Sequence, residues 1–291
     1  MSWRTVILAD RAKVDYSMGY MVVRGKEVHR VFMDEVETIL LESTAVSLTA
    51  AWINECIRRK IKIIFCDEKR NPCGEILPYC GSYDTSRCIR SQIHWDRSWI
   101  QQVWTVIVTE KIRQQAVVLR EFGKTEAADL LAAYQSQMQL GDATNREGHA
   151  AKVYFNALFG LEFSRRHDTE ENSALNYGYA IILSAFNREI AASGYLTQLG
   201  IFHDNVFNPF NLGCDLMEPF RPLVDRMVLH MEIETFGSAE KRHIVNLLNE
   251  TVRISGKQTT VTQAIKLYSR SILQAIEEKN LECIRFYEYG V

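Results

Sequence analysis

The sequence lacks a long apolar run, and this absence excludes one large class of protein. Among its 291 residues, no stretch approaches the roughly 20 consecutive apolar residues that a membrane helix needs. Asp10 and Arg11 also lie where a secretory signal requires apolar residues. We therefore expect no membrane span and no cleaved signal, which predicts a cytoplasmic protein.

The sequence also lacks a CxxC pair, although it contains seven cysteines. Without a secretory signal, a chain of this size is expected to keep its thiols reduced in a cytosol. A zinc site built from Cys73, Cys80 and Cys88 is a minor alternative.

There is little net charge of either sign, since the formal value is −2 at pH 7. Proteins that bind nucleic acids usually carry a basic excess, so the global charge does not by itself predict a DNA-binding protein. Basic residues do gather locally, at 58–62, at 69–70, and at Arg87, Arg90 and Arg97. These clusters suit a phosphate-facing surface, but solvated helix ends and loops explain them equally well.

The first part of the chain is typical of a small β-rich domain. With 47% hydrophobic residues, the whole chain is long enough to bury a large core and to form two domains. A helix is predicted over Ser47–Arg59, with Ser47 as its N-cap. Short apolar or β-branched runs predict strands at 5–9, 21–24, 27–33, 38–41 and 61–66.

Regular structure is interrupted at 71–74 and 78–82, and helical spacing dominates afterwards. We expect a β-rich domain over 1–77 that contributes to dimerisation, a linker over 78–89 and an all-α catalytic domain over 90–291. The fold class is therefore α+β. Helices are predicted over 95–121, 125–138, 173–193, 225–232, 239–252 and 261–278.

Three side chains stand out as candidates for a metal site. Glu147 follows a turn with capping residues, His203 lies in an irregular stretch, and Glu218 lies near a helix start. Two carboxylates and one imidazole leave coordination positions for water and phosphate oxygens. Taken singly, each acid is explained by the helix dipole and the histidine by an ordinary hydrogen bond.

The residues around these three resemble those of one known family. The runs are Asn-Arg-Glu-Gly-His-Ala-Ala-Lys-Val-Tyr-Phe (145–155), Asn-Tyr-Gly-Tyr-Ala (176–180), Gly-Ile-Phe-His-Asp-Asn (200–205) and Asp-Leu-Met-Glu-Pro-Phe-Arg-Pro (215–222). They resemble the CRISPR adaptation integrases, the Cas1 family, over about 142–226. The form Glu-Pro-Phe-Arg-Pro looks most like the version that accompanies the single-protein type II effector nuclease.

The resemblance implies roles for individual residues. Glu147, His203 and Glu218 would be both the catalytic residues and the ligands of Mg²⁺ or Mn²⁺. Asp215 would be an N-cap or would support a ligand, and direct ligation of the metal by Asp215 is a further alternative. His149 is not expected to be a ligand, because residues two apart on a helix point about 200° apart. Further candidates for ligand support or DNA contact are Arg146, Arg221, Tyr154 and Asn176.

The resemblance also implies a function and partners. The protein would be a prokaryotic, metal-dependent DNA integrase that inserts foreign DNA fragments into a CRISPR array. Its partners would be the DNA fragment, the CRISPR repeat, a second copy of the chain and the small adaptation subunit Cas2, and further adaptation proteins and the effector nuclease are other candidates. Two alternatives stay open: a stand-alone metal-dependent nuclease acting on branched DNA or RNA, and a non-catalytic DNA-binding scaffold.

Overall fold

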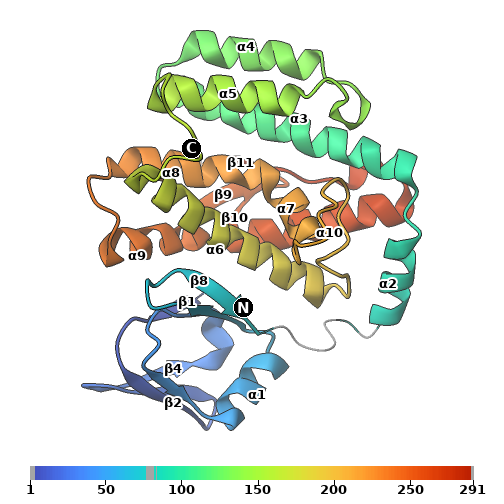
Figure 1. Cartoon of the computed structure of the whole chain (residues 1–291). Helices are drawn as coiled ribbons and strands as arrows, with labels where there is room; N and C mark the ends of the chain where they lie inside the picture. Colours follow the sequence, from blue (N-terminus) through green and yellow to red (C-terminus); the bar gives the residue numbers. More distant parts are fainter. Residues whose placement is uncertain (1–3, 77–81, 83, 290–291) are drawn as a thin grey trace.

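The computed structural model describes residues 4–76, 82 and 84–289. Its N-terminal part contains two four-stranded sheets and one helix, and lies at the bottom of Figure 1. One sheet has the order β1-β5-β7-β8 and the other β4-β3-β2-β6. The elements are β1 (Arg4–Leu8), β2 (Ala12–Ser17), β3 (Tyr20–Arg24), β4 (Val28–Phe32), β5 (Val36–Leu41), β6 (Val46–Leu48), α1 (Ala50–Arg58), β7 (Lys62–Cys66) and β8 (Pro72–Glu75).

The sheet that contains β5 and β7 is covered on both faces. Successive side chains of a strand point to opposite sides. Accordingly, Ile39 and Ile63 pack into the core of the β-rich part, whereas Leu40 and Ile64 pack into the core of the helical part. This explains why all six residues of β5 are buried. It also fixes the sheet firmly against the helices.

Two local predictions for the N-terminal part were wrong. Ser47 lies in β6, and the N-cap of α1 is Thr49, whose side chain accepts a hydrogen bond from the Trp52 nitrogen at 3.4 Å. The segment beginning at Pro72, which was expected to interrupt the sheet, forms β8. Proline is tolerated there because β8 is an edge strand that needs fewer backbone donors.

The expected linker at 78–89 is only partly covered by the described residues. Positions 78–81 and 83, including Cys80 of the zinc alternative, lie outside them. Helix α2 (Thr85–Ile93) begins inside the expected linker. In the part of the chain that the structure describes, no helix is long and apolar enough to cross a membrane.

The helical part contains nine more helices or helical turns that concern the site, together with a small sheet. Helices α3, α4 and α5 lie at the top of Figure 1, above α6, α8 and α10. Asp96 caps α3 by accepting from the nitrogens of Ser98 and Trp99. The elements are α3 (Arg97–Glu121), α4 (Thr125–Ser136), α5 (Arg146–Phe159), α6 (Glu170–Ala192), α7 (Asn211–Met217), the 3₁₀ turn η3 (Glu218–Phe220), α8 (Arg221–Met231), α9 (Ser238–Asn246) and α10 (Val261–Glu278).

The mixed α+β class is confirmed, with one addition to the expected all-helical domain. Strands β9 (Thr251–Ile254), β10 (Lys257–Thr260) and β11 (Tyr287–Tyr289) form an antiparallel sheet of order β10-β9-β11. The pair Ser255-Gly256 joins the first two strands with φ angles of 51° and 75°. Positive φ angles at both turn residues are typical of a tight hairpin. The helix expected over 239–252 ends early, because α9 stops at Asn246 and the backbone is extended from Glu250 into β9.

Candidate active site

Glu147 lies in the first turn of α5, as its sequence context predicts. Asn145 caps the helix by accepting a hydrogen bond from the Gly148 nitrogen at 3.3 Å. The Asp142 carboxylate accepts from the nitrogens of Arg146 and Glu147, at 2.7 and 3.0 Å. These capping contacts hold the start of the helix, and with it the backbone of Glu147, in a defined place.

His203 lies in the irregular segment between α6 and α7, also as predicted, and Asp215 holds it there. Asp215 accepts from the backbone nitrogens of Ile201, Phe202 and His203 at 2.5, 3.1 and 3.0 Å. Its Oδ1 lies 2.6 Å from Nδ1 of His203. A carboxylate accepts, so Nδ1 carries a proton and Nε2 is the nitrogen available to a further ligand.

Aromatic rings from α3 and from the same loop pack beside His203. Phe202 stacks on Trp104 with centroids 4.5 Å apart and an interplanar angle of 2°. The His203 ring meets Trp104 edge-on at 5.8 Å. Trp104 comes from α3, which therefore buttresses the loop that carries the histidine.

Glu218, at the start of η3, is brought to Glu147 by a lysine from α3. Nζ of Lys111 lies 2.5 Å from Oε1 of Glu147 and 2.5 Å from Oε2 of Glu218. Since both oxygens are 2.5 Å from one nitrogen, they are at most about 5 Å apart. Arg221 donates from Nε to the other oxygen of Glu218 at 2.8 Å. The two predicted acids thus share one cationic neighbour.

Charge and burial shift the pKa values of these side chains in opposite directions. Burial would raise the pKa of Glu218, but the charges of Arg221 and Lys111 together lower it below its ordinary value. Burial would likewise lower the pKa of Lys111, yet the charges of Glu218 and Glu147 raise it. The hydrogen bond to Asp215 raises the pKa of His203, with further contributions from Glu218 and Glu147. His203 therefore lies within the electrostatic field of both acids.

A cavity of about 250 Å³ opens beside Glu218 and Lys111. Tyr179 forms part of its wall, with the guanidinium of Arg221 4.6 Å and that of Arg165 5.3 Å from its ring centroid. The Tyr179 hydroxyl donates to the buried Asp225, whose pKa burial raises to about 6. Two guanidinium groups at the edge of an acidic pair suit a phosphodiester, because they bind its oxygens in a planar fork.

The donor set fits a hard divalent cation. In the described ranges, no three side chains among His, Cys, Asp and Glu already surround one point in the way a metal requires. Instead, the Lys111 ammonium lies between the two carboxylates, which is the place and the charge sign that a cation would take. Two carboxylates with one imidazole nitrogen are ligands suited to Mn²⁺ and Mg²⁺. The ligand assignment to Glu147, His203 and Glu218 stays a prediction.

The remaining candidates have different surroundings. The N-cap alternative for Asp215 was wrong, because α7 begins at Asn211 and Asp215 lies inside it. Tyr154 is fully buried in the core. Asn176 accepts from Arg165 at 2.5 Å, and the Arg146 guanidinium lies 5.3 Å from the centre of the Tyr134 ring.

Sequence reasoning missed Lys111 and Asp225. Lys111 had a detectable signal, because it falls four residues after Ile107 and three after Val108 on the apolar stripe of α3. A lysine on the buried face of a helix needs a partner. Asp225 gave no comparable signal, since an acid early in a helix is ordinary.

The basic clusters expected to face phosphates are largely paired within the molecule. Arg58 and Arg59 both contact Glu55, and the buried Lys62 pairs with Glu75. Arg70 pairs with Glu42, and Arg87 with Asp84. These pairs make most of the three clusters poor candidates for a free phosphate-binding surface.

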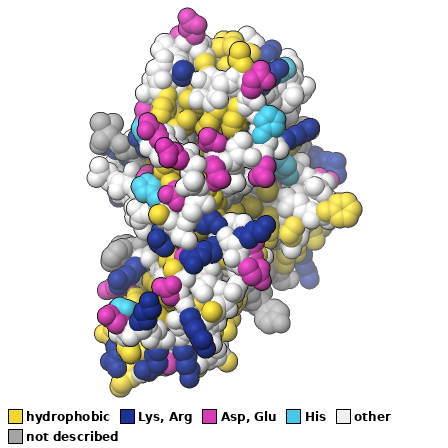
Figure 2. All heavy atoms as spheres, turned by 60° about the vertical axis from the view of Figure 1, so that its left-hand side comes forward, with side chains coloured by type: hydrophobic (Ala, Val, Ile, Leu, Met, Phe, Trp, Pro, Cys, Tyr) yellow, Lys and Arg dark blue, Asp and Glu magenta, His cyan; other side chains and the backbone are white. Residues whose placement is uncertain are grey.

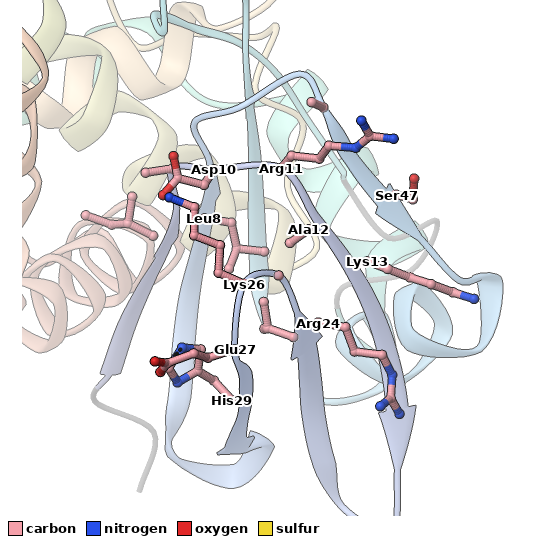
Figure 3. A pocket seen from close by; sticks show the side chains of 15 residues that line it. Leu8, Asp10, Arg11, Ala12, Lys13, Arg24, Lys26, Glu27, His29 and Ser47 are labelled. Atoms are coloured by element: carbon pink, nitrogen blue, oxygen red, sulfur yellow. Dashed lines mark ion pairs between the residues drawn. The ribbon is translucent and has the colours of Figure 1, made fainter.

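Other basic side chains line an open groove of about 1010 Å³ in the β-rich part. Arg11, Lys13 and Lys26 line it and form no ion pair with the described residues. In Figure 3, Asp10 and Lys26 are drawn on the left of the groove, and Arg11 and Lys13 on the right. Figure 2 likewise shows Lys and Arg gathered over the lower, β-rich part, with Asp and Glu more frequent above.

Comparison with known proteins identifies the family of the chain. The family model described as "CRISPR associated protein Cas1" matches residues 6–235. A protein of Neisseria meningitidis named CRISPR-associated endonuclease Cas1 is 31% identical over 99% of this chain and 97% of its own length. Among solved structures, a casposase bound to integration product is similar with a TM-score of 0.77, at 19% identity over 97% of this chain and 92% of that chain.

A second solved structure, of a Cas6-RT-Cas1–Cas2 complex, matches 97% of this chain with a TM-score of 0.70 and 17% identity. The chain covers 36% of that longer chain. At these low sequence identities, the two structures support a similarity of fold alone. The family model and the Neisseria relative, in contrast, extend over most or all of the sequence, including the segments of Glu147, His203 and Glu218. The chain belongs to the Cas1 family.

Proposed function

We propose that this protein is a metal-dependent DNA integrase that inserts DNA fragments into a CRISPR array. The observation that carries the proposal is the acidic pair of Glu147 and Glu218 around a single cationic position, with His203 held nearby by Asp215. Each of the three comes from a different segment, so only the fold, and not the local sequence, could bring them to one metal ion. The Cas1 relative named an endonuclease and the casposase bound to integration product support this chemistry.

Glu147, Glu218 and Nε2 of His203 would hold Mg²⁺ or Mn²⁺, which supplies charge stabilisation at a phosphodiester when bound. Lys111 keeps the two acids together as a pair until then. Arg221 contacts Glu218 and stacks on Tyr179, so its remaining donors are pre-oriented toward the adjacent cavity. Asp215 fixes the tautomer of His203.

The attacking group would be the 3′-hydroxyl of the incoming DNA. Its oxygen displaces the 3′-oxygen at a phosphodiester of the CRISPR repeat, so one phosphodiester forms as another breaks. The attacking hydroxyl gives up its proton, and the released 3′-oxygen takes one up to become a hydroxyl. No serine or tyrosine of the protein needs to act as a nucleophile in this reaction.

Insertion at both ends of a fragment requires two active sites. A symmetric homodimer provides them, because a two-fold axis relates identical sites. We further propose Cas2 as the partner that joins such dimers, since the Cas6-RT-Cas1–Cas2 complex contains a chain of the same fold. Further adaptation proteins and the effector nuclease are proposed as additional partners on the basis of the type II resemblance.

The decisive experiment is a half-site integration assay with the purified protein, Cas2 and Mn²⁺. We expect Glu147→Gln to abolish strand transfer while folding and DNA binding persist, because glutamine preserves the shape but removes a ligand charge. Integration by this variant at the wild-type rate would show that the acid is structural.

The products separate the alternatives. Joined strands indicate an integrase, whereas free ends alone indicate a stand-alone nuclease on branched DNA or RNA. Absence of both, with DNA binding intact, would favour a non-catalytic scaffold.

A further inference from the structure

Lys111 occupies a position that it has to leave when a cation binds between the two acids. Its Nζ lies 2.5 Å from both Oε1 of Glu147 and Oε2 of Glu218, where the proposed metal would lie. Two cations at contact distance repel each other strongly in a protein interior, where the effective dielectric constant is low. Val108 and Ile112, beside Lys111 on α3, are fully buried in the core. The side chain of Lys111, and not the helix, therefore has to move.

The cavity of about 250 Å³ beside the acids is the space into which this side chain can turn. Lys111 already lines it, together with Gln115 of the same helix. Residues four apart on a helix lie on the same face. Gln115 is 2% exposed, and its Oε1 accepts no hydrogen bond from the described residues. A buried amide oxygen without a donor is unfavourable, so Gln115 offers an acceptor for the displaced ammonium group.

The charges around the cavity indicate what enters it together with the ammonium group. Arg165 and Arg221 also line it, so an inward Lys111 would be the third cation. Glu218, one of the two acids of the lining, would then be a metal ligand, which leaves Asp225 alone against three cations. Cations this close destabilise one another unless an anion lies between them. A phosphate group has the charge and the acceptor oxygens to bind all three.

We propose that Lys111 is a phosphate-binding residue of the metal-loaded site, whose ammonium group leaves the acids when the metal binds and then contacts a DNA phosphate beside Arg165 and Arg221. This role rests on the proposed DNA integrase function and deepens it. In the second position, Gln115 accepts a hydrogen bond from the ammonium group. Metal and DNA strengthen each other's binding, because the phosphate stabilises the charge that the metal displaces, and such coupling is reciprocal.

A simple counter-ion would behave differently. If Lys111 only neutralised the acids in the metal-free protein, its removal would tighten metal binding equally with and without DNA. If its ammonium group goes on to bind phosphate, its removal tightens metal binding without DNA but weakens the coupling between metal and DNA. The two roles are therefore separated by the effect of DNA on the metal affinity, without any measurement of strand transfer.

The test measures Mn²⁺ affinity from the electron paramagnetic resonance signal of the free ion, which falls when the ion binds. Full-length protein is titrated alone and with a DNA duplex whose 3′ ends lack the hydroxyl group, so that no strand transfer occurs. Without DNA, we expect Lys111→Met to bind Mn²⁺ about ten-fold more tightly than the wild type, since no ammonium group competes. DNA should raise the Mn²⁺ affinity of the wild type about ten-fold more than that of Lys111→Met.

A second variant tests the same proposal without removing a buried charge. Gln115→Leu leaves Lys111 and both acids in place and removes only the acceptor of the second position. It should bind Mn²⁺ about five-fold more weakly than the wild type when DNA is absent, which corresponds to one lost hydrogen bond. Lys62→Met is the control, because Lys62 is a buried, paired lysine of the β-rich part. It should match the wild type with and without DNA.

The outcomes separate this role from the proposed function. Wild-type coupling between Mn²⁺ and DNA in Lys111→Met would overturn the proposal, and so would wild-type Mn²⁺ affinity in Gln115→Leu. If Glu147→Gln loses Mn²⁺ binding while either of these results is found, only the role of Lys111 fails. If Glu147→Gln binds Mn²⁺ as tightly as the wild type, the metal site is wrong, and the proposed function fails together with the role of Lys111.

Discussion

Asp215 Oδ1 accepts from both Nδ1 of His203, at 2.6 Å, and the backbone nitrogen of the same residue, at 3.0 Å. One carboxylate therefore fixes the ring and the main chain of His203 together. Asp215 is fully buried in α7, so its hydrogen bonds fix the irregular loop of His203 relative to this helix. A histidine without such support would have to be ordered by the metal at an entropic cost.

The first prediction concerns this support. We expect Asp215→Asn to weaken Mn²⁺ binding by about 10- to 100-fold, as is typical for groups that orient a metal ligand. The variant should also lower thermal stability, because the amide nitrogen cannot accept the bonds that the carboxylate accepts from Ile201 and Phe202. His203→Ala serves as the comparison, since it should lose metal binding with little loss of stability. Calorimetric titration and thermal unfolding measure both effects, and unchanged Mn²⁺ affinity in Asp215→Asn would contradict the assigned role.

The second prediction concerns the lysine between the two acids. Lys111→Met should destabilise the metal-free protein by about 3–5 kcal/mol, because it leaves the buried Glu218 without one of its two cations. Added Mn²⁺ should restore stability more in this variant than in the wild type, since the metal no longer competes with an ammonium.

Lys62→Met is the matched control for Lys111→Met. Lys62 is also buried and paired with an acid, Glu75, but lies in the β-rich part. It should lose stability without any rescue by Mn²⁺. Equal rescue of both variants in denaturant titrations would mean that the metal acts elsewhere.

The sequence predicted the elements whose signals are local. Helix α10 spans the expected residues 261–278, because its apolar stripe and the capping Thr260 are both adjacent in sequence. The start of α5 before Glu147 was likewise predicted from its turn and cap. Strands β9 and β11 were not predicted, since each is only three or four residues long and their pairing joins segments more than 30 residues apart.

In the candidate site, too, local sequence indicates some residues, whereas others depend on how distant elements pack. The family-like contexts indicate Glu147, His203 and Glu218 as candidates, but no local pattern could show that Lys111 would lie between the acids. That contact depends on how α3 packs against α5 and η3. No local pattern could show the ion pairs of the basic clusters either, because Arg70 pairs with Glu42, which follows β5, and Lys62 pairs with Glu75 of β8.

The third prediction tests the junction between the β-rich and helical parts. Arg188 of α6 donates to Glu37 of β5 at 2.6 Å and also pairs with Glu189, and both acids are buried. Arg188→Met should cost about 3–5 kcal/mol in the free energy of unfolding, because it leaves two buried carboxylates without their cation.

Neutralising Glu37 and Glu189 shows whether unpaired charge or lost packing causes the loss of stability in Arg188→Met. Adding Glu37→Gln and Glu189→Gln to Arg188→Met should recover much of the loss if unpaired charge causes it. Urea denaturation of the single and triple variants measures the difference. A triple variant no more stable than Arg188→Met would assign the loss to packing instead.

The last prediction concerns pH and the buried Asp225. Burial raises its pKa from 3.8 to about 6, which hydrogen bonds from tyrosine only partly offset. The folded protein therefore holds a proton that the unfolded chain releases near pH 4, so this contribution to stability is complete below about 3.8 and is lost as pH rises through about 6. At about 1.4 kcal/mol per pH unit, its size is about 3 kcal/mol. Asp225→Asn keeps an acceptor for the Tyr179 hydroxyl but cannot ionise. Denaturant titrations at pH 5 and pH 8 should thus show the variant gaining stability relative to the wild type at the higher pH, and a difference that does not change with pH would contradict the raised pKa.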